Sequence, residues 1–204
     1  MIIPTVLIGY GFAQFMIDPI VDLNLKVRSE ITSRVNTQCH LDNYSQYAPA
    51  GAVYALNLLG IKGKHNFLDR SIILATSAAV VGISVTGIKA LTHIKRPDGS
   101  SFDAFPSGHT ATAFACAEFL YQEYKDKSLW YGITGYAIAA GTGFLRIYNN
   151  RHWLTDVVAG AGFGILSTKI AYWVFPKIKK LFFKDIQVSF SFSPSFDPRY
   201  GSIR

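Results

Sequence analysis

The stretch Ser71–Gly87 reads SIILATSAAVVGISVTG, and Leu129–Leu145 reads LWYGITGYAIAAGTGFL. Neither stretch contains a charged residue. A helix of a water-soluble bundle shows a polar face at a spacing of 3.6 residues, whereas these two show only scattered small polar residues. About 20 apolar residues are needed to cross the hydrocarbon core of a bilayer. The sequence therefore favours membrane helices over the alternative, a soluble all-helical bundle with an unusually apolar core.

Six segments are long and apolar enough to cross a membrane, which predicts an all-α integral-membrane bundle of six transmembrane helices over residues 1–184. They are Met1–Ile17, Tyr44–Ile61, Ser71–His93, Ser107–Tyr124, Ser128–Tyr148 and Trp153–Phe175. No basic stretch precedes the apolar run of the first segment, so we expect an uncleaved span and not a signal peptide. The sequence assigns no structure to the C-terminal tail, residues 185–204.

The composition agrees with a membrane protein. Half of the residues are hydrophobic and 16% are charged, against roughly a quarter charged in soluble domains. The net charge of +7 lies in short connections and forms no basic stripe with interleaved aromatic residues, which argues against nucleic acid as a partner. Anionic lipid headgroups are the expected partners of these charges. Cys39 and Cys116 do not make a disulfide framework.

The distribution of lysine and arginine predicts the orientation. With six spans, both termini and the even-numbered connections share one face, which carries eleven basic residues against eight on the other. Three of those eight belong to the site described below. The positive-inside rule therefore places both termini in the cytoplasm and the odd-numbered connections outside.

Eight residues with phosphate chemistry fall in or beside the third and fifth connections, which share the outer face. They are Lys89, Arg96, Ser107, Gly108 and His109 around the third connection, and Arg146, His152 and Asp156 around the fifth. Each residue alone has an ordinary explanation, such as a lysine at the end of a span or a helix start at Pro-Ser-Gly. Their joint spacing on one face is what predicts a site.

The cations and the helix start suit a phosphate group. Lys89, Arg96 and Arg146 supply three positive charges, and the arginine fork matches two phosphate oxygens. Ser107 and Gly108 open a helix, where free N–H groups and the helix dipole favour an anion. Gly108 also allows close approach of the backbone, and the Ser107 hydroxyl adds a hydrogen bond.

The remaining residues suit nucleophilic catalysis. His152 and Asp156 are four residues apart and share a helix face. The carboxylate holds one imidazole nitrogen as N–H and leaves the other free to attack. His109 is then available to protonate the leaving oxygen. A carboxylate one turn inside an apolar helix is costly and usually functional.

Other polar residues have simpler interpretations. Glu118 is interpreted as a cytoplasm-side or packing residue and not as a catalyst, and Gly160 and Gly164 have the spacing of close helix packing. The other histidines are interpreted as ordinary loop or interface residues: His40, His65 and His93. No cluster has zinc-site spacing and no aspartate pair suggests two metals, so we expect neither a metal nor another cofactor.

Three segments resemble the signature of the type 2 phosphatidic acid phosphatase superfamily. They are Lys89-x6-Arg96-Pro97, Pro106-Ser107-Gly108-His109 and Arg146-x5-His152-x3-Asp156. The six-span pattern is similar to its membrane lipid phosphatase branch. The family usually has serine before the arginine of the third segment, where this chain has Leu145, so one hydrogen bond to phosphate is missing.

The resemblance implies roles for these residues. His152 attacks phosphorus, Asp156 orients it and His109 protonates the leaving group. Five residues bind phosphate: Lys89, Arg96, Ser107, Gly108 and Arg146. Water then hydrolyses the phosphohistidine. The resemblance also implies a multi-pass protein of the bacterial inner membrane with a periplasmic active site.

Three alternative functions are compatible with these sequence features. The first is a lipid phosphatase whose substrate is a polyprenyl diphosphate, lipid A, phosphatidylglycerophosphate or phosphatidate. The second is a vanadate-dependent haloperoxidase, which the apolar spans disfavour. The third is a membrane anion-binding or transport protein, which needs no pairing of His152 with Asp156. The connection Asp18–Asn43 is expected to contribute to lipid selectivity, and the sequence leaves the oligomeric state open.

Overall fold

The computed structural model describes residues 2–34 and 37–182, and all regular elements in these ranges are helices. The C-terminal tail considered above, residues 185–204, lies outside the described residues. The helices are α1 (Ile2–Ala13), α2 (Asp18–Thr32), α3 (Asp42–Ser45), α4 (Ala48–Leu58), α5 (Phe67–Thr92), α6 (Gly108–Tyr124), α7 (Leu129–Tyr148) and α8 (Leu154–Phe182). The all-α prediction is confirmed for these ranges.

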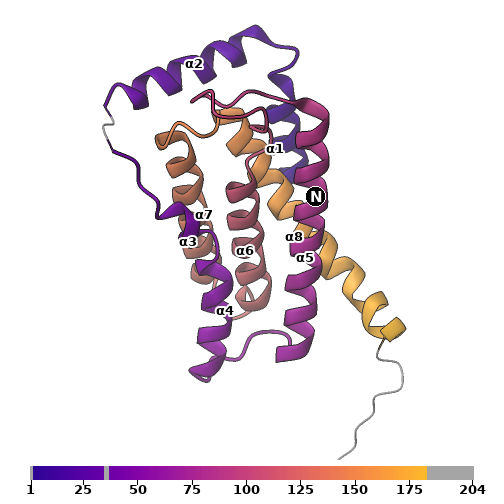
Figure 1. The fold of residues 1–204 in the computed structure, drawn as a ribbon. Coiled ribbons are helices and arrows are strands. Elements are labelled where there is room, and N and C mark those ends of the chain that lie inside the picture. The colour runs from indigo at the N-terminus through magenta and orange to yellow at the C-terminus, as the bar shows by residue number, and fades with distance from the viewer. Residues whose placement is uncertain (1, 35–36, 183–204) are drawn as a thin grey trace, which may run out of the picture.

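The bundle is arranged around α6. This helix packs against α4, α5, α7 and α8, and α1 packs on the outside of α8. Consecutive long helices run in opposite directions, so the connections after α5 and α7 meet at one end and those after α4 and α6 at the other (Figure 1). The residues singled out from the sequence therefore gather at one end of the bundle.

Only some of the helices are long enough to cross a membrane by themselves. α5 and α8 are long and apolar enough to cross a bilayer, and α1 with α2 would make a third span, bent by 90°. α1, α4 and α6 have 12, 11 and 17 residues, fewer than the roughly 20 of a straight crossing. The chain is a multi-pass membrane protein, and two or three of its spans are identified by length and composition.

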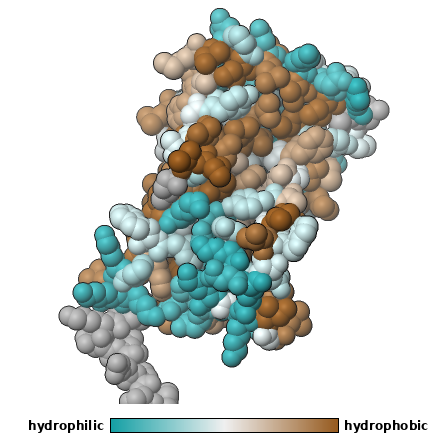
Figure 2. Space-filling view, turned by 180° about the vertical axis from the view of Figure 1, so that it is seen from behind, coloured by the Kyte–Doolittle hydropathy of each residue, from teal (hydrophilic) through white to brown (hydrophobic). Residues whose placement is uncertain are grey.

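The surface supports the membrane setting. Large hydrophobic side chains are exposed along the outward faces of the bundle, for example Val6 at 62%, Ile83 at 76% and Trp173 at 67%. Figure 2 shows apolar surface over most of the upper part of one face, with hydrophilic residues gathered at the lower end. Such a large exposed apolar area marks a surface that is covered in the native setting, here by lipid.

Close helix packing is built on glycine. A Cβ on Gly160 would lie 2.6 Å from the carbonyl oxygen of Ser107, and one on Gly164 would lie 2.2 Å from that of Ala111. Both glycines therefore let α8 lie directly against the backbone of α6. This confirms the prediction that the four-residue spacing of Gly160 and Gly164 serves close helix packing.

Glu118 is a buried packing residue, as the sequence analysis expected. It is 1% exposed, forms an ion pair of 2.9 Å with Lys169 and accepts hydrogen bonds from Tyr136 and Gln122. Cys39 and Cys116 are both free thiols. The first connection, in contrast, is not a simple loop, since it contains α2, which lies across the end of the bundle (Figure 1).

Candidate active site

The turn between α7 and α8 determines where His152, the predicted nucleophile, lies. Asn150 adopts a left-handed conformation (φ 55°) after the helix ends at Tyr148. Its N–H donates to the carbonyl of Ile147 (2.9 Å), and the N–H of Arg151 donates to that of Arg146 (3.0 Å). This is a Schellman motif. It also brings the N–H of His152 to 3.3 Å from the same Arg146 carbonyl.

His152, in the turn before α8, and Asp156, in the first turn of α8, face each other. His152 Nδ1 lies 3.5 Å from Asp156 Oδ2, and the two side chains are 2% and 0% exposed. This separation is long for a hydrogen bond, and catalytic hydrogen bonds often shorten only in the substrate complex. Asp156 Oδ2 accepts from the N–H of Trp153 at 2.8 Å, which fixes the carboxylate against the first turn of the helix.

The start of α6 is joined to this turn. The N–H of Ser107 donates to the backbone carbonyl of Asp156 at 3.0 Å. Ser107 is the N-cap of α6, and its hydroxyl oxygen accepts from the hydroxyl of Thr110 at 2.9 Å. A Cβ on Gly108 would meet only Val85, at an ordinary 3.7 Å, so helix packing does not require glycine there. The close approach of a ligand to the backbone explains this glycine better.

Lys89 and Arg96 share one carboxylate, that of Asp103. Arg96 Nε lies 2.9 Å from Asp103 Oδ1 and Arg96 Nη2 donates to Oδ2 at 3.0 Å, while Lys89 Nζ lies 3.6 Å from Oδ2. Lys89 also donates to the Asp103 backbone carbonyl. The two cations thus already hold one anionic group together.

The third cation, Arg146, is buried and forms an ion pair with Asp42 of α3. Its Nε is buried and has no hydrogen-bond partner, so one donor of the fork is free for a ligand oxygen. His109 lies beside this pair, with Nε2 3.0 Å from Asn43 Oδ1. α3 therefore positions both residues.

Burial and positive charge act together on His152. Burial, and then the charges of Arg146, Lys89 and Arg96, lower the pKa of His152 well below its usual value. All three predicted phosphate-binding cations are thus within electrostatic reach of the imidazole, and His109 is within reach of Arg146 and His152. The imidazole is neutral at neutral pH, which is the form that attacks as a nucleophile.

α2 is fastened over this end of the bundle. Asn24 is 5% exposed, donates to the Thr155 hydroxyl at 2.9 Å and accepts from its backbone N–H at 3.2 Å. Arg28 donates to Asn150 at 3.0 Å and lies over the ring of Trp153. α2 therefore contacts three residues within three positions of His152, namely Asn150, Trp153 and Thr155.

The eight predicted residues thus gather at one end of the bundle. The side chains of His152 and Asp156 are buried, and the charges of the three cations act on His152. Sequence reasoning missed the partners that hold them, namely Asp42, Asn43 and Asp103. Asp103 had a weak signal, because it is a carboxylate three residues before the Pro-Ser-Gly helix start. The described residues contain no group of three or more histidine, cysteine, aspartate or glutamate side chains able to hold a metal ion.

Residues 86–180, which carry all eight site residues, match the model of the PAP2 superfamily. This part of the chain belongs to the PAP2 superfamily. Its resemblance to the type 2 phosphatidic acid phosphatases is therefore confirmed.

Two curated proteins are similar to this chain. The lipid A 1-phosphatase of Porphyromonas gingivalis is 41% identical over 146 residues, which is 71% of this chain and 32% of that protein. The bacitracin transport permease protein BcrC of Bacillus licheniformis is 33% identical over 76 residues, which is 37% of this chain and 36% of that protein. The matches span about a third of the length of these relatives.

Two crystal structures share the fold. LpxE of Aquifex aeolicus is 25% identical with a TM-score of 0.56, covering 74% of this chain and 95% of that one. A PAP2-type phosphatidylglycerolphosphate phosphatase of Bacillus subtilis, described as transmembrane, is 22% identical with a TM-score of 0.60, covering 88% of this chain and 99% of that one. At 22% identity, the second match shows a shared fold and nothing about function.

Proposed function

We propose that the chain is an integral-membrane phosphatase that hydrolyses a phosphate monoester or diphosphate of a lipid through a phosphohistidine and without a metal. The observation that carries this proposal is the buried His152, backed by Asp156 and surrounded by three cations. A neutral imidazole in a positive site is suited to attack an anionic phosphoryl group. A protein that only binds or transports an anion has no use for a nucleophile paired with a carboxylate.

In the first step, a free nitrogen of His152 attacks phosphorus while Asp156 holds Nδ1–H. The phosphoryl oxygens lie among Lys89, Arg96, Arg146 and the N–H groups at Ser107 and Gly108, where positive charge stabilises the transition state. The P–O bond to the lipid breaks, and His109 gives its proton to the leaving oxygen.

In the second step, water attacks the phosphohistidine. His109, now neutral, takes a proton from that water, the P–N bond breaks, and inorganic phosphate leaves with His152 restored. The three fixed cations supply the charge stabilisation that a metal ion supplies in other phosphatases.

Lipid A phosphorylated at position 1 is our first candidate substrate. It rests on the 41% identity to a lipid A 1-phosphatase over 146 residues, and on the fold shared with LpxE. A polyprenyl diphosphate, phosphatidylglycerophosphate and phosphatidate present the same phosphate to the same residues and are the competing substrates.

The proposed setting is the bacterial inner membrane, with six spans, the active site at the periplasmic face and both termini in the cytoplasm. The alternating direction of α1, α4, α5, α6, α7 and α8 supports six spans, with the shorter ones completed by flanking residues.

Phosphate release from a panel of these four lipid phosphates by the purified chain in detergent tests the proposal. We expect release from at least one lipid, unaffected by chelator and inhibited by vanadate, which mimics five-coordinate phosphorus. Activity that disappears in chelator and returns with a divalent ion would contradict the mechanism. Lack of release from every lipid, with a folded protein, would contradict the function.

A further inference from the structure

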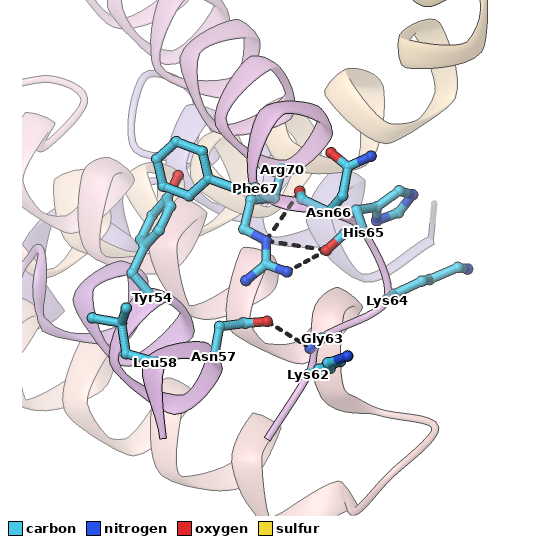
Figure 3. A pocket seen from close by; sticks show the side chains of 10 residues that line it. All are labelled: Tyr54, Asn57, Leu58, Lys62, Gly63, Lys64, His65, Asn66, Phe67 and Arg70. Carbon is cyan, nitrogen blue, oxygen red and sulfur yellow. Dashed lines mark hydrogen bonds between the residues drawn. The ribbon is translucent and has the colours of Figure 1, made fainter. Parts of the chain in front are cut away.

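A pocket of about 590 Å³ lies at the end of the bundle opposite the candidate active site. It is formed by the end of α4, the connection to α5 and the first turn of α5, and Figure 3 shows its ten lining residues. Three of the ten are cations, Lys62, Lys64 and Arg70, and none is a carboxylate. The volume is in the range of pockets that hold small molecules.

Arg70 is the buried charge of this pocket. It is 4% exposed, and its hydrogen bonds from Nε and Nη2 go to the backbone carbonyls of His65 and Asn66. None of the ion pairs between described residues includes it. Figure 3 shows its remaining terminal nitrogen directed away from His65, toward Tyr54 and Leu58. A buried cation without a carboxylate partner is costly, and an anion in the pocket would compensate it.

Two carboxylates close to the pocket, those of Glu123 and Asp69, are engaged elsewhere. Glu123 accepts from the backbone N–H of His65 (3.0 Å) and from Tyr172 (2.8 Å), and it lies 2.7 Å from His65 Nδ1. Asp69 forms an ion pair with Lys179 at 2.7 Å. Neither compensates the charge of Arg70 by direct contact.

The connection that carries the lysines is held in place. Asn57 accepts from the N–H of Gly63 at 3.1 Å, and the N–H of Lys64 donates to the backbone carbonyl of Glu123 at 3.0 Å. Tyr124 donates to the carbonyl of Ile61 at 2.9 Å. The pocket is therefore already formed before a ligand binds, which lowers the entropic cost of binding.

The outer wall of the pocket is apolar and exposed. Leu58 is 90% exposed and Phe67 72% exposed, and Tyr54 lines the pocket between them. We propose that this pocket binds one anionic phospholipid, with its headgroup phosphate between Lys62, Lys64 and Arg70 and its acyl chains against Leu58 and Phe67. A soluble organic phosphate shares the headgroup chemistry but would leave the apolar wall uncovered.

Titration of the full chain in a neutral detergent, followed by native mass spectrometry, tests this proposal. The probes are dioctanoyl phosphatidylglycerol, dioctanoyl phosphatidylcholine and glycerol 3-phosphate. Lys62→Gln with Lys64→Gln should weaken binding of phosphatidylglycerol on the order of tenfold, because each lysine contributes to attraction of an anionic lipid. Both lysines are exposed, so this variant is expected to fold.

The matched control is Lys127→Gln with Lys180→Gln, which removes the same charge from exposed positions at the same end but outside the pocket. It should change the affinity for phosphatidylglycerol less than twofold. Equal losses in the two variants would overturn the proposal in favour of diffuse charge attraction. Glycerol 3-phosphate binding as tightly as phosphatidylglycerol would overturn the assignment to a lipid.

Arg70→Gln gives a second variant, expected to weaken binding of phosphatidylglycerol at least as much as the lysine pair. Unchanged affinity in a folded Arg70→Gln protein would overturn the role of Arg70. The readout is binding, so the outcome does not depend on whether the chain hydrolyses any lipid.

Discussion

Asp103 occupies the position between Lys89 and Arg96 that a substrate phosphate needs in the proposed mechanism. Partial burial alone would raise its pKa, but the Ser101 hydroxyl and the charges of Lys89 and Arg96 outweigh it and lower the pKa of Asp103 to about 2. The carboxylate therefore stays charged throughout the physiological pH range and competes with an incoming anion.

Asp103→Asn should release this competition. We expect vanadate to inhibit the variant at a concentration several-fold lower than the wild type, because Lys89 and Arg96 no longer share a charged partner. Asp98→Asn, in the same connection but paired with Arg151 at 3.0 Å, is the matched control and should leave the inhibition constant unchanged. Weaker inhibition of Asp103→Asn would show that Asp103 positions the cations instead of competing for them.

The charge state of His152 makes a separate prediction. Burial and the three cations lower the pKa of His152, so the neutral nucleophile should persist well below pH 6.5 and be lost only as the pH falls through the lowered value. NMR titration of labelled histidine, assigned with His152→Ala, measures this directly. Lys89→Gln should raise the pKa of His152, whereas Lys95→Gln, an exposed control, should not. A wild-type titration near the ordinary 6.5 would contradict the electrostatic account.

At this scale, the sequence predicted that the eight residues gather at one end of the bundle, but it did not predict which residues hold them in place. Spacing predicted that His152 and Asp156 face each other, because a separation of four residues on one helix is a local relation that needs no knowledge of the fold. The pairing of Arg146 with Asp42 joins residues 104 positions apart. No pattern in the sequence near Asp42 indicates that it pairs with Arg146, so only the structure reveals this contact.

At the scale of elements, the contact between α6 and α8 is the one on which the site depends most, because it joins Ser107 to Asp156. Gly164→Ala should destabilise the protein, since the new Cβ would meet the Ala111 carbonyl at 2.2 Å and overpacking typically costs about 1–3 kcal/mol. Gly82→Ala, with nothing within 4 Å of its Cβ, should be neutral or stabilising through helix propensity. The thermal unfolding midpoint in detergent compares the two, and equal midpoints would contradict the close packing.

Some helix boundaries were predicted more accurately than others, for a physical reason. Both ends of α7 were predicted to within one residue, because Ser128 caps its start and Asn150 terminates it. The first segment was expected to reach Ile17, but α1 ends at Ala13 and Asp18-Pro19 begin α2. Hydrophobicity continues across that bend of 90°, so hydropathy alone does not reveal it.

At the scale of the whole molecule, the alternating helices place the candidate site and the lipid pocket at opposite ends, which makes the orientation testable. A cysteine at Ser100, in a background lacking Cys39 and Cys116, should react with an impermeant thiol reagent added to intact spheroplasts. One at Lys64 should react only after the membrane is opened, and both positions are exposed. The reverse pattern would place the active site in the cytoplasm.

The central claim is that His152 becomes phosphorylated during turnover. His109→Ala keeps the nucleophile but slows hydrolysis of the intermediate, since general acid–base catalysis contributes about 10²–10⁴-fold. A radiolabelled aryl phosphate, whose leaving group departs without a proton, should therefore load this variant, and quenching without acid should preserve the label. We predict acid-labile phosphate on His152, absent from the variant that also carries His152→Ala. Label on Ser107, or normal turnover by His152→Ala alone, would contradict the account.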